Sequence, residues 1–128
     1  MPERGDIDLF YCYAGENVTA MCSFYVMYAL VGTNKGRVYV CDVYPGPVVA
    51  LEGEIITALC ATDHAIYIGT NKGMIYEQMI MEDTMSVLAN LNREVLSMMI
   101  MGADTEWAPF LSVGVEGGNV YAVAIEDW

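Results

Sequence analysis

The sequence predicts an all-β fold built from three repeated units, and three observations support this. A five-residue turn sequence occurs identically as Gly32–Gly36 and Gly69–Gly73, with a weaker third copy at Gly114–Gly118. Each unit consists of strand-sized runs separated by turn residues, with little helical periodicity. An aliphatic residue and a tyrosine follow each turn, as Val38-Tyr39, Ile75-Tyr76 and Val120-Tyr121.

A second signature precedes each turn at a similar distance. It reads Val18-Thr19-Ala20-Met21, then Ile56-Thr57-Ala58-Leu59, then Val95-Leu96-Ser97-Met98. Because two independent signatures stay in step three times, at a spacing of about 38 residues, the repeat is the main evidence for the fold. It divides a single unit, 1–128, into repeats of approximately 17–54, 55–93 and 94–128.

The middle repeat allows the most detailed prediction. We expect its strands at 55–61, 65–69, 74–80 and 84–89, with the glycine of the Asn-Lys-Gly turn at positive φ. Four short antiparallel strands in about 38 residues match one blade of a β-propeller. Neighbouring blades cover both faces of such a sheet, so its inner strands need not alternate between apolar and polar residues. This agrees with a hydrophobic content of 55%.

The units resemble WD repeats in the order of their parts: a Val-x-Ala opening strand, a Gly-Thr pair, a tight turn, and a strand ending at Val43. Cys41 stands where that family has tryptophan, and Asp42 matches its aspartate. The corresponding dipeptides later in the chain are Gln78-Met79 and Val123-Ala124, and the family's Gly-His pair is absent. The resemblance implies a propeller that acts as a scaffold and binds other proteins. A quinoprotein-like or other blade family remains an alternative.

Three blades are fewer than the usual four to eight of a closed propeller. The segment from Phe10 to Cys22 aligns without a gap to Val48–Cys60, so residues 8–13 correspond to an exchanged outer strand. The last repeat stops after its third strand. We expect two chains to join head to tail as a six-bladed homodimer. The alternative is completion by another propeller segment, as in part of a larger signalling or trafficking protein.

The net charge of the chain indicates which class of partner it can bind. The chain has 5 Lys+Arg against 17 Asp+Glu, a formal charge of -12, which argues against nucleic acid and favours basic peptides or protein surfaces.

No apolar run reaches the roughly 20 residues that span a membrane, and the N-terminus does not resemble a secretion signal. We therefore expect a cytoplasmic protein without a membrane span.

Four cysteines, none in a CxxC pair, lie within apolar runs: Cys12, Cys22, Cys41 and Cys60. Buried free cysteines behave as small hydrophobic residues, so we expect structural thiols in a reducing compartment. The alternative is a disulfide framework.

The third repeat contains an inserted loop, 102–109, in which Trp107 lies close to the acidic residues Asp104 and Glu106. Tryptophan is enriched at binding hot spots, so this loop is a candidate contact site for a basic or apolar partner. The alternative is that Trp107 folds back over its own blade. The other predicted protein-binding residues are Glu106, Asp104, His64, Lys35 and Lys72.

Little in the sequence favours catalysis. The single histidine has no positioned serine or cysteine partner, no acidic pair has the setting of a calcium loop, and no phosphate-binding loop precedes a helix. We expect no enzyme activity, cofactor or metal. The alternative is a propeller-based enzyme whose acidic channel residues bind a divalent metal.

Overall fold

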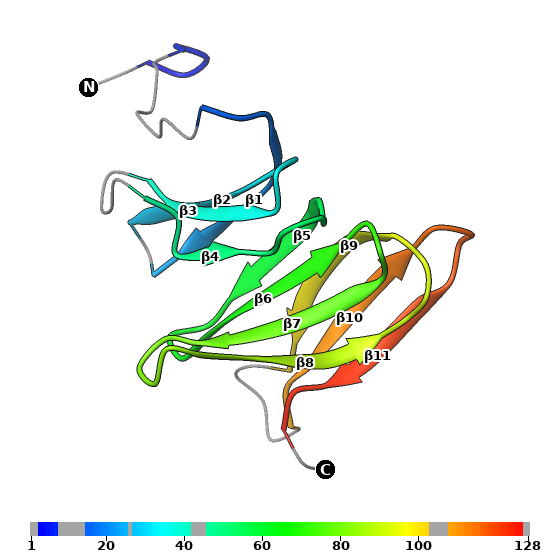
Figure 1. Cartoon of the computed structure of the whole chain (residues 1–128). Helices are drawn as coiled ribbons and strands as arrows, with labels where there is room; N and C mark the ends of the chain where they lie inside the picture. The colour runs from blue at the N-terminus through cyan, green and yellow to red at the C-terminus, as the bar shows by residue number, and fades with distance from the viewer. Residues whose placement is uncertain (1–2, 8–14, 26, 42–45, 103–107, 127–128) are drawn as a thin grey trace.

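The computed structural model describes residues 3–7, 15–25, 27–41, 46–102 and 108–126, and across these ranges it contains strands and no helix (Figure 1). The first sheet comprises β1 (Val18–Phe24), β2 (Tyr28–Thr33), β3 (Arg37–Val40) and β4 (Val49–Ala50). The second comprises β5 (Ile56–Ala61), β6 (Ala65–Thr70), β7 (Met74–Met79) and β8 (Thr84–Asn90). The third comprises β9 (Val95–Met101), β10 (Phe110–Val115) and β11 (Val120–Ala124).

Within each sheet, strands that follow one another along the chain pair antiparallel, so every sheet is a simple meander. The all-β prediction is confirmed, and the strands predicted for the middle repeat agree with β5–β8 to within one residue at each end. The third sheet has three strands within the described part of the chain, in agreement with the prediction that the last repeat stops after its third strand. The proposed outer strand at 8–13 lies outside the described residues.

The sequence repeat is also a repeat of pairing register. The glycine near the end of each second strand lies opposite an aliphatic residue of the third strand: Gly32 opposite Val38, Gly69 opposite Ile75, and Gly114 opposite Val120. The first strand also has an irregularity at a corresponding point in each sheet, next to this glycine. The three sheets are therefore copies of one pattern.

The Asn-Lys-Gly turns have the predicted backbone. Gly36 and Gly73 have φ of 75° and 82°, and each donates its N–H to the carbonyl three residues earlier, on Thr33 at 3.2 Å and on Thr70 at 3.1 Å. A residue with a side chain is strained in this left-handed conformation, which explains the glycine.

The sheets stack through their first strands, with β1 against β5 and β5 against β9 (Figure 1). One apolar core fills the space between the first and second sheets, and another lies between the second and third. The second sheet is thus covered on both faces, and all six residues of β6 are buried. This explains why the inner strands of the middle repeat show no alternation of apolar and polar residues.

The cysteines require a correction. Cys22 and Cys60 are free, and burial raises the pKa of their thiols to about 11 and about 12. Cys41, however, is disulfide-bonded, so the expectation of a structural thiol is wrong at this position. The cysteines no longer argue for a reducing compartment.

Within the described ranges no helix is long and apolar enough to cross a membrane.

Candidate functional site

A partly buried hydrogen-bond network joins the second sheet to the connection that precedes it. Thr70, fully buried, donates its hydroxyl to Glu54 Oε1 at 2.9 Å, and Tyr76 donates its hydroxyl to Glu54 Oε2 at 2.6 Å. The Thr70 hydroxyl also accepts the backbone N–H of Lys72 at 3.3 Å. One carboxylate therefore links the turn, the third strand and the connection between two sheets. Burial, and then the hydrogen bond to Glu54, raise the pKa of Tyr76 to about 12.

The first sheet has the same network. Thr33 donates its hydroxyl to Glu16 Oε1 at 2.9 Å, and the Tyr39 hydroxyl lies 3.5 Å from the same oxygen. Arg37 adds an ion pair to the other oxygen of Glu16, and this carboxylate raises the pKa of the arginine. Two successive repeats thus share a glutamate, threonine and tyrosine that act as one hydrogen-bonded unit.

The third sheet has replaced this network. Arg93 and Val115 occupy the positions of the glutamate and the threonine, and Tyr121 is 38% exposed. Because the side chain of Val115 cannot donate a hydrogen bond, a glutamate at the position of Arg93 would lack the partner that threonine provides in the other two sheets. This network was not predicted from the sequence, although Glu16 and Glu54 keep the repeat spacing and each stands two residues before an opening strand.

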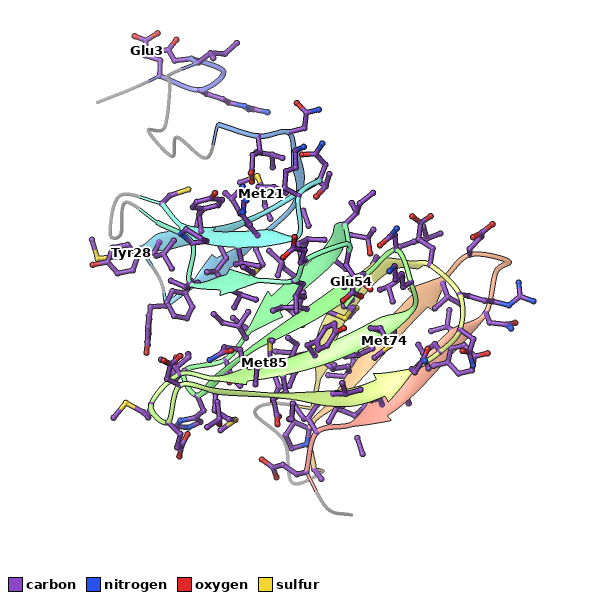
Figure 2. The ribbon with its side chains drawn as sticks, viewed as in Figure 1. Glu3, Met21, Tyr28, Glu54, Met74 and Met85 are labelled. Carbon is purple, nitrogen blue, oxygen red and sulfur yellow. The ribbon has the colours of Figure 1, made fainter. Side chains whose placement is uncertain are left out.

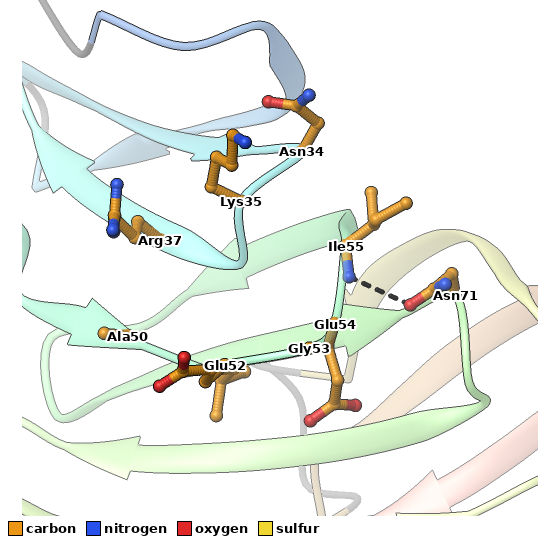
Figure 3. A pocket seen from close by; sticks show the side chains of 10 residues that line it. Asn34, Lys35, Arg37, Ala50, Glu52, Gly53, Glu54, Ile55 and Asn71 are labelled. Atoms are coloured by element: carbon orange, nitrogen blue, oxygen red, sulfur yellow. Dashed lines mark hydrogen bonds between the residues drawn. The ribbon is translucent and has the colours of Figure 1, made fainter.

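A first groove of about 490 Å³ lies between the first and second sheets, at the end of the strands that carries the Asn-Lys-Gly turns (Figure 3). Lys35 and Arg37 line it together with Glu52 and Glu54, so its charge is mixed. Some of its polar groups already have partners within the chain. The Ile55 N–H, for example, donates to Asn71 Oδ1 at 2.9 Å.

A second groove, of about 460 Å³, lies between the second and third sheets at the opposite strand ends. Its polar side chains include Asp63, His64, Glu77 and Glu126. Burial, followed by the charge of Glu77, raises the pKa of Tyr67 in its wall well above the usual range. The apolar part of the wall consists of Met79, Ile100, Pro109 and Ile125. A third groove, of about 540 Å³, has mostly apolar walls between the first two sheets.

The residues predicted to contact a partner lie at both ends of the strands, and some fall outside the described residues. Lys35 and Lys72 lie in equivalent turns at one end of the strands, and Lys35 lines the first groove. His64 lies at the other end and lines the second groove. Residues of the inserted loop that were predicted to bind a partner fall outside the described residues: Asp104, Glu106 and Trp107. The described residues contain no group of three or more His, Cys, Asp or Glu placed to hold a metal ion.

No family model matches the chain, and no curated protein matches it in sequence. Among solved structures, the chain is similar to a computationally designed protein, Ika4, with a TM-score of 0.64 and 23% sequence identity over 85% of this chain. The chain spans 66% of the length of that protein. At this identity the likeness concerns the fold alone. The structure and this likeness together show a blade-like all-β fold of three stacked antiparallel sheets.

Proposed function

We propose that this chain forms part of a WD-repeat-like β-propeller whose function is to bind a basic segment of another protein. Three antiparallel meanders stacked through their first strands, with one turn motif per sheet, support the propeller. Propellers serve many functions, so the fold alone does not select binding. The feature that favours binding is the second groove.

The second groove combines negative charge with apolar walls. Asp63, Glu77 and Glu126 contribute three carboxylates, and the described lining contains neither lysine nor arginine. A lysine or arginine side chain fits this combination, because its aliphatic stem packs on apolar groups while its charged end pairs with carboxylates. This juxtaposition of Glu77 and Glu126 beside Met79 and Ile125 is the observation that carries the proposal.

The overall charge of the chain supports the same partner. A formal charge of -12 attracts cationic surfaces from a distance and accelerates encounter at low ionic strength. Affinity for a basic segment should therefore fall as salt is added, because salt screens exposed charges. An apolar peptide of equal length lacks this dependence.

Fluorescence anisotropy with labelled peptides tests the proposal. The protein is titrated against a lysine- and arginine-rich peptide and against a peptide of the same length in which those residues are glutamine. We expect measurable affinity for the basic peptide, and a loss of about threefold to tenfold in the double variant Glu77→Gln/Glu126→Gln. Glutamine retains an acceptor for neighbouring donors while removing the charge.

The matched control is the double variant Glu82→Gln/Glu116→Gln, because both residues are exposed and absent from the lining of the groove. It also removes two negative charges, so it corrects for the general effect of net charge. Equal affinities of the wild type and Glu77→Gln/Glu126→Gln, or equal losses in that variant and the control, would overturn the assignment to this groove.

A further inference from the structure

The sheets are joined by a contact between a glycine and an aliphatic side chain. A Cβ atom built on Gly32 would lie 2.3 Å from Ile56 Cγ2, and one built on Gly69 would lie 2.6 Å from Val95 Cγ1. Both Ile56 and Val95 are 0% exposed. The first strand of each following sheet thus inserts an aliphatic side chain into the space that a glycine leaves open on the preceding sheet.

The residue opposite each glycine also takes part in this contact between sheets, which we call a junction. Val38 lies opposite Gly32 and Ile75 lies opposite Gly69, and both aliphatic residues are 0% exposed within the two cores. A junction therefore has two halves. The receiving half is a glycine with its opposite aliphatic residue, and the inserting half is the aliphatic residue that opens the next sheet.

The third sheet carries a receiving half that nothing in the described chain fills. Gly114 lies opposite Val120, as in the other two sheets, but Val120 is 71% exposed. A Cβ atom on Gly114 would approach only Ser97 Oγ, at 3.3 Å. Met99, at the position of the buried Cys60, is 57% exposed.

The first sheet carries the matching inserting half. Val18 occupies the position of Ile56 and Val95 but is 52% exposed, and Met21, at the position of the buried Leu59, is 63% exposed (Figure 2). On this face Val18 and Met21 of β1 are exposed, whereas Val31 and Tyr39 of the neighbouring strands are buried. The exposed side chains are those that the two internal junctions bury.

We infer that a second copy of this chain fills both halves, with Val18 and Met21 of one copy packed against Gly114 and Val120 of the other. The contact reproduces the register of the two internal junctions, so the chain itself defines the occupant. A junction of this kind is heterologous and closes into a ring when the rotations add to a full turn. Two copies give six sheets, within the usual four to eight, whereas one copy gives too few and three give too many.

Mass in solution is the first test. Sedimentation equilibrium or light scattering at about 0.15 M salt, where exposed charges are largely screened, should give twice the chain mass of 14.1 kDa. The variants Val18→Asp and Val120→Lys should each give the single-chain mass, since each places an unpaired charge in an apolar contact. Met81→Asp, at a residue that is 86% exposed and outside both halves, should retain the doubled mass.

Mixing the two monomeric variants is the decisive test. In a mixed ring, one junction contains both substitutions, which are opposite in charge, and the other junction is entirely wild-type. The mixture should therefore recover the doubled mass that neither variant shows alone. Unfolding of either variant is detected by circular dichroism, and a misfolded variant would not be rescued by mixing.

Three results would overturn the inference: a wild type at the single-chain mass, a doubled mass that survives both substitutions, or a mixture that stays monomeric. A doubled mass that Val18→Asp abolishes and Val120→Lys leaves intact would instead indicate a symmetric contact between two first sheets, and would also refute it. The second groove lies within one chain, so its binding of basic peptides succeeds or fails independently of this result.

Discussion

Tyr76 and Glu54 are joined by a hydrogen bond of 2.6 Å between the tyrosine hydroxyl and Oε2 of the carboxylate. The tyrosine belongs to the third strand of the second sheet, whereas the glutamate lies in the connection from the first sheet. Together with Thr70, which binds the other carboxylate oxygen at 2.9 Å, this contact fixes the connection between two sheets to the turn of the second.

Replacement of the shared carboxylate should destabilise the fold. Glu54→Ala leaves the hydroxyl of Thr70, which is 0% exposed, without its acceptor, and an unsatisfied buried hydroxyl costs about 1–3 kcal/mol. Urea unfolding should show this loss of free energy. Glu52→Ala removes a nearby exposed carboxylate outside the network and should change stability by less than about 0.5 kcal/mol. Equal effects of the two substitutions would refute the role of the network.

The tyrosine in this network should make stability fall at alkaline pH. Its pKa is about 12 in the folded chain, above the ordinary value of about 10 for tyrosine. Because folding favours the neutral phenol, the contribution is complete below pH 10 and is lost as the pH rises toward 12. Unfolding free energies measured between pH 9 and 12 should decline, and Tyr76→Phe should decline less over the same range. Parallel curves for the two proteins would contradict this assignment.

The cysteines should differ in their reaction with iodoacetamide. Burial raises the pKa of Cys22 from 9.0 to about 11 and that of Cys60 to about 12, and only the thiolate reacts. At pH 8 the native protein should therefore label about 100-fold more slowly than the denatured protein at Cys22 and about 1000-fold more slowly at Cys60. Cys41 should label only after reduction, since it is disulfide-bonded. Mass spectrometry of the digested protein distinguishes the sites, and rapid native labelling of Cys60 would refute its burial.

A methyl group at the second junction should be poorly tolerated. Gly69→Ala places Cβ 2.6 Å from Val95 Cγ1, and overpacking of a filled core costs about 1–3 kcal/mol. The control is Gly46→Ala, because no atom lies within 4 Å of the added Cβ. Thermal unfolding of the two variants should show a lower midpoint for the first alone. If both unfold at the wild-type temperature, the glycine contact does not determine the packing.

The sequence predicted what depends on local spacing. The repeated turns required glycine at positive φ, as Gly36 and Gly73 show, and the short runs between turns gave the strands of the middle repeat almost to the residue. The lack of alternation between apolar and polar residues in β6 predicted that neighbouring sheets cover both of its faces, and all residues of this strand are buried. These features are encoded within single repeats.

Features that depend on several repeats together were not predicted. Glu54 contacts residues of two later segments, Thr70 and Tyr76, so its role emerges only once the strands are paired. The second groove combines segments as distant as His64 and Glu126. The disulfide of Cys41 also contradicted an expectation drawn from its apolar neighbours, because such neighbours do not reveal whether a thiol is within bonding distance of another.

The absent methyl groups at Gly32 and Gly69 have a geometric consequence. Each allows the next first strand to approach more closely than any side chain would permit, and so sets the wedge angle between successive sheets. A bulkier residue would widen the wedge and alter the curvature of the stack. In the proposed head-to-tail assembly this curvature would decide whether the copies close into a ring, because an assembly that misses closure grows into an open filament.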